Sequence, residues 1–208
     1  MGICGLFPKK NTSKPHPEHF KYPYLLTGLE ICRPNQVWGT DITFVRIGQL
    51  WFYLVAVLDW FSRYVVAWKL SSTLSADFCV AALEKALTVN LPDIINSDQG
   101  SQFTSEEYQG VFKAYPQIRI SMDGRGRCFH NIFTERLWRT VKYEEVYLHD
   151  YQSLAEAEAS LKDYFQIYNH ERLHSALDYQ TPAEIYFQTK ELNILKVEKL
   201  SKKLIITV

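Results

Sequence analysis

Three apolar runs rich in β-forming residues follow one another closely, and they constrain the fold of this chain more than any other feature. They span Val37–Val45, Leu50–Asp59 and Tyr64–Leu70, with Gly48 in the first turn. Short β-rich runs separated by turn residues predict hairpin-linked strands of one sheet. The chain therefore begins its folded part with three consecutive strands.

After these strands, segments with helical spacing of apolar residues alternate with short apolar runs. The expected helices start near Asp77, Ser105, Asn131 and Ser153, and the last three are expected to end near Ala114, Tyr147 and Asn169. Further strands are expected at Ile94–Ile95 and Ile118–Ser121. The order β-β-β-α-β-α-β-α predicts an α/β fold with a mixed five-stranded sheet flanked by helices.

The composition is that of a globular protein, since 47% of the 208 residues are hydrophobic and 22% are charged. The 23 basic residues balance the 23 acidic ones, so any basic surface for nucleic acid must be local. No apolar run approaches the ~20 residues that cross a bilayer, and no secretory signal opens the chain. The four cysteines form no C-x-x-C pair, which is typical of free thiols in a reducing compartment. We expect a soluble, cytoplasmic protein.

Changes in composition divide the chain into three expected regions. Residues 1–34 hold five of the eight prolines and several lysines, which predicts an extended, mobile, basic linker. Residues 35–187 form the core with a C-terminal helical extension. Residues 188–208 form a lysine-rich tail.

Three acidic residues occupy positions where chemistry is expected. Asp41 lies inside the first strand, Asp98 directly follows a short buried strand, and Glu135 lies in a helix after a loop rich in glycine and arginine. Each alone has an ordinary explanation: an aspartate bonded to nearby backbone, a turn or cap aspartate, and a glutamate on a solvated helix face. Together they place three acids on three separate elements, which is what hard divalent cations require.

The coordination chemistry of Mg²⁺ explains why three acids on separate elements indicate a metal site. Mg²⁺ prefers oxygen ligands and commonly takes one or two carboxylates together with substrate phosphate and water. Three acids can therefore hold two ions. Two ions about 3.5–4 Å apart would activate an attacking water or 3′-hydroxyl and stabilise the leaving oxygen in a displacement at phosphorus.

Five motifs, in order along the chain, resemble those of the DDE transposases of bacterial insertion sequences, whose catalytic core is similar to that of retroviral integrases. The resemblance runs from about Gly5 to Phe187. The motifs that carry it are Trp38–Thr43, Val57–Arg63, Ser97–Phe103, Ile120–Arg127 and Tyr168–Arg172. Any one of them is modest evidence, whereas five in the family order are specific.

The resemblance implies a ribonuclease-H-like fold in which Asp41, Asp98 and Glu135 are the catalytic residues and bind two Mg²⁺ or Mn²⁺ ions. It also implies cleavage at the ends of a DNA element and strand transfer into target DNA, with double-stranded DNA as the partner and a homo-oligomer on that DNA. Family members normally carry upstream DNA-binding segments, so we expect this chain to be N-terminally truncated.

The spacing of the acids departs from the family pattern. Positions 99–134 place 36 residues between Asp98 and Glu135, one more than is usual in the family. We expect the extra residue in the turn near Tyr115-Pro116-Gln117, where an insertion is tolerable. Glu144 and Glu145 lie too far along the helix to replace Glu135.

Polar and basic residues near the acids are candidates for contacts with the DNA backbone, which position DNA without reading its sequence. The candidates are Gln99, Gln102, Arg125, Arg127, Arg139, Lys142 and Arg172. Helical spacing puts Arg139 and Lys142 near the catalytic face. The alternatives are that these two offset acids on a wet helix, that the glutamines form an ordinary polar loop, and that the last arginine belongs to a packing motif. Asp59, a fourth acid, is expected to serve a turn or to pair with Arg63.

Two other functions remain open at this point. A nuclease of the same fold would use the same acids but would hydrolyse DNA or RNA–DNA hybrids without joining strands. A catalytically inactive remnant would keep only DNA binding or oligomerisation. His130 and Leu173 replace the Asp and Pro that the family commonly has, which would fit a decayed copy.

Overall fold

Five strands form one mixed sheet in the computed structural model, which describes residues 21–124 and 132–187. The strands are β1 (Val37–Ile47), β2 (Leu50–Asp59), β3 (Val65–Ser71), β4 (Ile94–Ser97) and β5 (Arg119–Met122), in the spatial order β3-β2-β1-β4-β5. The first three strands pair antiparallel, whereas β4 pairs parallel with both β1 and β5. The predicted mixed sheet of five strands is confirmed.

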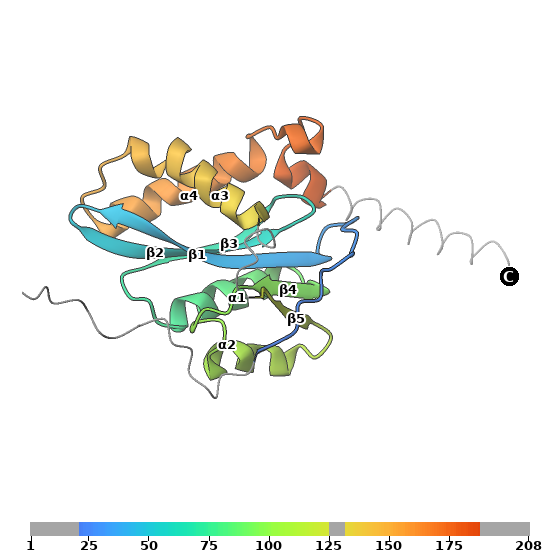
Figure 1. Ribbon diagram of the computed structural model, residues 1–208. Helices are drawn as coiled ribbons and strands as arrows, with labels where there is room; N and C mark the ends of the chain where they lie inside the picture. Colours follow the sequence, from blue (N-terminus) through green and yellow to red (C-terminus); the bar gives the residue numbers. More distant parts are fainter. Residues whose placement is uncertain (1–20, 125–131, 188–208) are drawn as a thin grey trace, which may run out of the picture.

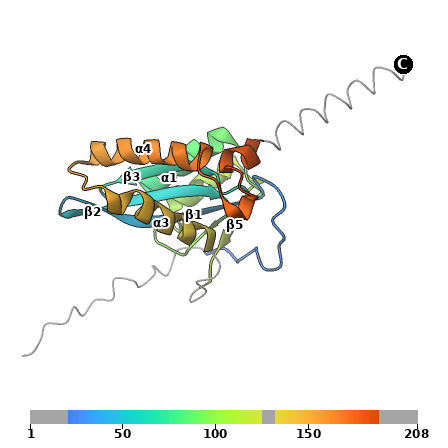
Figure 2. The same ribbon diagram turned by 90° about the horizontal axis from the view of Figure 1, so that it is seen from above.

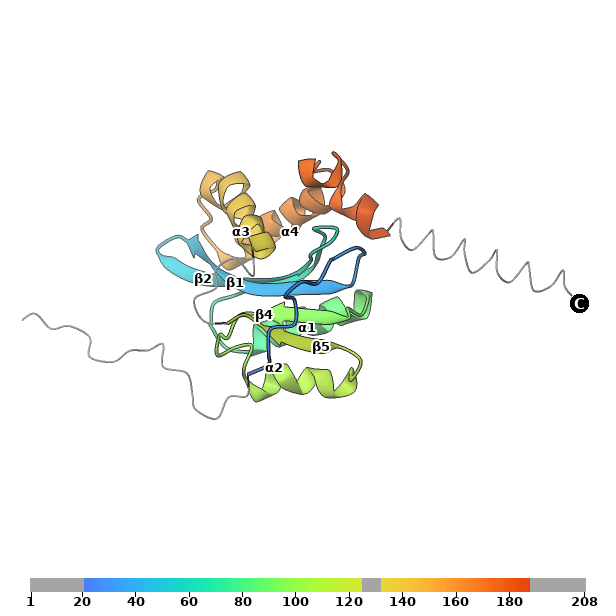
Figure 3. The same ribbon diagram turned by 45° about the vertical axis from the view of Figure 1, so that its right-hand side comes forward.

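Helices cover both faces of this sheet. They are α1 (Asp77–Val89), α2 (Glu106–Val111), α3 (Ile132–Glu144) and α4 (Leu154–His170). Figures 1 and 3 show α3 and α4 on one face with α1 and α2 on the other, and Figure 2 shows α3 and α4 from above. Among the described residues, no helix has the length and apolar character needed to span a membrane.

Two of the predicted helices end earlier than expected. The second predicted helix ends as an α-helix at Val111 and continues as a 3-10 turn over Phe112–Ala114. The third ends at Glu144 and is followed by a separate 3-10 turn over Val146–Leu148. The helix starts follow local chemistry more closely, since the side chains of Ser105 and Ser153 accept hydrogen bonds from backbone N–H groups of the first turns of α2 and α4.

The core is split into two clusters because side chains alternate between the two faces of each strand. The cluster beneath α3 and α4 includes Val45, Leu54, Leu58, Leu137, Val141, Leu161 and Phe165. The cluster on the α1 and α2 side includes Trp38, Val55, Val57, Phe78, Leu83, Ile95, Phe103 and Tyr108.

The segment before β1 corrects one expectation. Residues 21–34 are irregular, as their prolines predict, but Leu26 is buried and Tyr24 packs on the same core. The backbone N–H of Leu25 donates to Ser121 Oγ at 3.0 Å, and that of Met122 donates to the Pro23 carbonyl at 3.4 Å. A mobile linker is therefore the wrong description of residues 21–34, because their apolar side chains have a core to pack against. Residues 1–20 and 188–208 lie outside the described part.

Candidate functional site

The register of two parallel strands brings Asp41 and Asp98 together. In the β1–β4 pair, Trp38 lies opposite Ile95 and Gly39 opposite Asn96. Extending this register by two residues places Asp41 beside Asp98, which follows the last residue of β4. The two carboxylates therefore meet where the parallel strands end, the edge at which open α/β sheets place ligand-binding groups.

Helix α3 is attached to this edge through Asp41. One carboxylate oxygen, Oδ2, accepts a hydrogen bond from the Trp138 indole N–H at 3.1 Å, and Oδ1 accepts one from the Ile42 backbone N–H at 2.8 Å. Glu135 precedes Trp138 by three residues, so both leave the helix on neighbouring positions of one side. Because Trp138 contacts Asp41, Glu135 in the first turn of α3 lies near the same part of the sheet.

The other two acids act on the ionisation of Asp41. The pKa of Asp41 is raised to about 7, first by burial and next by the nearby charge of Asp98, with a smaller contribution from Glu135; the hydrogen bonds from Ile42 and Trp138 oppose the shift. Asp98 keeps an exposed face, yet the protein packed around it raises its pKa as well, against the hydrogen bond from the Gly100 N–H. The carboxylates of the site thus repel one another, and binding a proton or a cation reduces this repulsion.

The three acids are not equally close. In residues 21–124 and 132–187, no three His, Cys, Asp or Glu side chains come together closely enough to hold one metal ion. Asp41 and Asp98 form a coupled pair, and Glu135 lies exposed at the margin of that pair. The structure therefore brings two of the three predicted ligands together and places the third nearby.

Gly39 makes the approach of α3 to the sheet possible, a role that sequence reasoning missed. A Cβ atom at Gly39 would lie 2.1 Å from Trp60 Nε1 and 3.0 Å from Thr134 Oγ1. Thr134 is fully buried and immediately precedes Glu135. A glycine inside a strand pattern is the signal that could have indicated such a close approach.

The loop after β4 is braced by its own polar side chains. Gly100 N–H donates to Asp98 Oδ1 at 2.9 Å. The Gln99 amide donates to the Asp123 carbonyl at 2.9 Å, and the Gln102 amide donates to the Leu74 carbonyl at 3.0 Å. Both glutamines thus hold the loop in place, and their predicted contacts with DNA stay a prediction.

The predicted basic residues are spread along α3 and beyond it. Arg139 is exposed one turn after Glu135, whereas Lys142 lies at the far end of α3 and lines a groove beside the β1–β2 hairpin. Arg172 is paired with Glu144 through hydrogen bonds of 2.6 and 2.8 Å. The predicted DNA contacts at Arg125 and Arg127 fall outside the described residues.

Three further acids, Asp59, Glu144 and Glu145, have structural partners. Besides the Glu144 pair, Glu145 accepts a hydrogen bond from the Tyr151 hydroxyl at 2.7 Å. Asp59 closes a turn, because its carboxylate accepts hydrogen bonds from Ser62 N–H at 2.8 Å and from Asn35 N–H at 2.7 Å. The turn role predicted for Asp59 is confirmed.

Two buried residues of the last motif serve packing. Asn169 is buried near the end of α4, where its amide donates to the Val65 carbonyl at 3.0 Å and its Oδ1 accepts from the Val65 N–H at 2.9 Å. Tyr168 is buried in the cluster beneath α3 and α4. These contacts attach α4 to the edge strand β3.

Comparison with known protein families identifies the domain. Two family models, both described as the integrase core domain, match residues 32–128 and 116–182. The chain is 32% identical over 163 residues to the transposase InsF for insertion sequence IS3A of Escherichia coli (strain K12), which covers 76% of this chain and 56% of that protein. It is also 32% identical over 155 residues to the transposase for insertion sequence element IS904 of Lactococcus lactis subsp. lactis (strain IL1403), covering 73% and 61%. The chain thus spans less than two thirds of the length of these relatives.

Solved structures share the fold. The HTLV-2 integrase catalytic core domain in complex with magnesium superposes with a TM-score of 0.61 at 22% identity, covering 74% of this chain and 97% of that one. A chain of the simian T-cell lymphotropic virus intasome in complex with PP2A regulatory subunit B56 gamma gives a TM-score of 0.62 at 20% identity, covering 82% of this chain and 60% of that one. The predicted ribonuclease-H-like fold is confirmed. The chain therefore belongs to the integrase core domain family, in the group that includes the transposases of bacterial insertion sequences.

Proposed function

We propose that this chain is a transposase catalytic core that cleaves DNA strands at the ends of an element and joins them to target DNA, with divalent metal ions held by Asp41, Asp98 and Glu135. The observation that carries the proposal is the coupling between Asp41 and Asp98 just beyond the point where the pairing of β1 with β4 ends. Two like charges on adjacent strands destabilise the fold unless a cation or a proton shares them.

The donor set fits Mg²⁺ or Mn²⁺. Carboxylate oxygens are the ligands that these hard cations prefer, and Mg²⁺ needs only one or two carboxylates beside substrate phosphate and water. The pair Asp41–Asp98 meets that requirement, and Glu135 supplies a third carboxylate at the margin of the site. When bound, two such ions supply the positive charge that activates a water or 3′-hydroxyl and stabilises the leaving oxygen.

The residues of the chain orient the carboxylates for this chemistry. The N–H groups of Ile42 and Trp138 hold both oxygens of Asp41, and the N–H of Gly100 holds Asp98. Arg139, exposed one turn after Glu135, is placed to bind a DNA phosphate. No covalent protein nucleophile is needed, because the attacking oxygen comes from water or from a DNA end.

The partners follow from the same reaction. Double-stranded DNA supplies both the element ends and the target, and coupling two ends requires at least two protomers on the DNA. A chain of this fold occurs in a viral intasome, which supports a homo-oligomer on DNA. Because the relatives belong to bacterial insertion sequences, we place the activity in the cytoplasm, where bacterial DNA lies.

The test is joining and disjoining of a branched DNA that mimics the strand-transfer product, because such a substrate demands little recognition of element ends. Wild type should give the joined and the disjoined DNA products with Mn²⁺ or Mg²⁺, and Asp98→Asn should give neither product. Asp163→Asn, which removes an exposed acid on α4, is the matched control and should behave as wild type. Hydrolysis without joining would indicate a nuclease instead, and a folded wild type that yields no product would contradict the proposal.

A further inference from the structure

Aromatic side chains gather near the turn of the β1–β2 hairpin, away from the acidic pair. Phe44 and Trp51 are 50% and 59% exposed, and their rings meet edge to face at 6.5 Å. Tyr53 packs against Phe44 at 5.3 Å. Tyr147, in the 3-10 turn after α3, lines the same groove, which has a volume of about 1070 Å³. We call this the hairpin groove, lined among others by Phe44, Arg46, Trp51, Tyr53, Lys142 and Tyr147.

The strand register explains why these side chains share one open face. Phe44 lies opposite Tyr53, and Arg46 lies opposite Trp51, so all four project from the same side of the hairpin. The neighbouring strand β4 pairs only with residues 37–39 of β1 and does not reach this end. Exposed aromatic clusters of this kind are costly in water and mark interaction sites.

The charges of the groove indicate what occupies it. Arg46 and Lys142 stand among the aromatic rings, with His149 at the rim, and Asp150 is the one acid among the described lining residues. The core of a protein–protein interface is typically depleted of charged residues. Aromatic rings on a sheet surface with cations beside them are typical of surfaces that stack unpaired bases and bind the phosphates between them.

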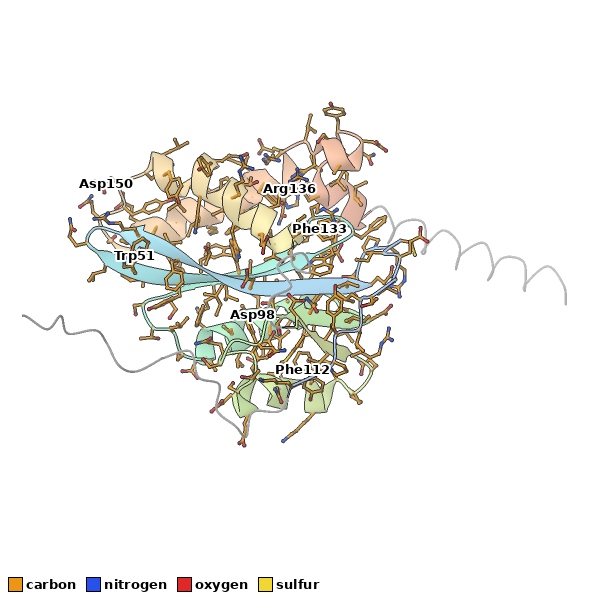
Figure 4. All side chains as sticks on the ribbon, in the orientation of Figure 1. Trp51, Asp98, Phe112, Phe133, Arg136 and Asp150 are labelled. Carbon is orange, nitrogen blue, oxygen red and sulfur yellow. The ribbon has the colours of Figure 1, made fainter. Side chains whose placement is uncertain are left out.

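We propose that the hairpin groove binds an unpaired stretch of the DNA substrate, with bases stacked on Trp51 and Phe44 and phosphates beside Lys142 and Arg46. This inference rests on the proposed function. Lys142 follows Glu135 by seven residues on α3, a distance of about 10 Å. At about 3.4 Å per stacked nucleotide, a strand leaving Glu135, at the margin of the site, reaches the groove after about three nucleotides. Figure 4 shows Trp51 and Asp150 at this hairpin end and Asp98 nearer the middle of the molecule.

The experiment measures binding in the absence of turnover. The full chain carrying Asp98→Asn is titrated in EDTA with a labelled oligothymidylate and with a duplex of equal length. The single strand should bind more tightly than the duplex. Adding Trp51→Ala should weaken single-strand binding about 5- to 100-fold, the range that loss of one base–aromatic stack produces, whereas Trp51→Phe should retain most of it.

Two further variants sharpen the test. Leu50→Ala is the matched control, because Leu50 is 67% exposed in the same hairpin but does not line the groove; it should leave the affinity unchanged. Lys142→Gln should lower the slope of log affinity against log salt by about 0.7, the contribution of one phosphate contact on a single strand.

The outcomes separate this inference from the proposed catalysis. An oligonucleotide affinity that Trp51→Ala does not change overturns the inference, as does a dimer, seen by sedimentation, that Trp51→Ala abolishes without affecting DNA binding. The latter would assign the groove to a second copy of the chain. If branched DNA is processed but Trp51 is irrelevant to binding, only the groove proposal fails. If binding depends on Trp51 but no metal-dependent product forms, only the catalytic proposal fails.

Discussion

Replacing Asp98 with asparagine should stabilise the fold at alkaline pH, because the lost carboxylate repels Asp41 across the β1–β4 pair. Two unit charges about 6 Å apart at an effective dielectric constant of about 20 repel by about 3 kcal/mol, or about two pH units in a pKa. Burial is the larger cause of the raised pKa of Asp41 and survives the substitution. We therefore expect that pKa to fall from about 7 by about one to two pH units. Asparagine still accepts the hydrogen bond from Gly100.

The pH dependence follows from the direction of the shift. The pKa of Asp41 is about 7 in the folded protein against 3.8 as the ordinary value. Between these values the folded protein holds a proton that the unfolded chain has released, so stability is fully present below about pH 4 and is lost as the pH rises through about 7. The full loss is at most about 4 kcal/mol. Asp98→Asn should match wild type near pH 4 and exceed its stability by about 1–3 kcal/mol at pH 8.

Urea unfolding in EDTA at pH 4, 6 and 8, followed by circular dichroism, measures these differences. Asp163→Asn controls for a general change in net charge. Adding Mg²⁺ at pH 8 should then stabilise wild type more than Asp98→Asn, because an ion that binds only the folded state shifts the unfolding equilibrium. A difference between Asp98→Asn and wild type that is the same at every pH would refute the coupling of the two carboxylates.

Three further substitutions test the packing around the site by the same unfolding measurements. Gly39→Ala should destabilise the fold by about 1–3 kcal/mol, because the new Cβ would lie 2.1 Å from the Trp60 ring. Unchanged stability would contradict the close packing of Trp60 and Thr134 against Gly39. Trp138→Phe removes a hydrogen bond that lowers the pKa of Asp41, so the loss of stability should shift to higher pH, and an unshifted profile would contradict this contact. Asn169→Ala should cost about 2–4 kcal/mol, since two backbone groups of β3 lose their partner, and a loss below 1 kcal/mol would argue against that role.

Local patterns in the sequence predicted most of the fold. Apolar runs rich in β-forming residues located β1 and β2, and the short apolar run Ile94–Ile95 located β4, because such runs are recognisable within a few residues. Ser105 and Ser153 marked two helix starts because capping is a contact between residues three apart. Helix ends were less accurate, since they depend on where packing stops.

The candidate site was predictable only in part. The sequence by itself determined which acids stand on three separate elements and in which order those elements follow. The tertiary structure alone decided how they meet: Asp41 bonds Trp138, 97 positions away, and Gly39 makes room for Trp60 and Thr134. It also decided that Lys142 faces the hairpin groove. Such contacts depend on the strand register and on the face of each element that packing turns inward, and these are set by residues distant in the chain rather than by local periodicity.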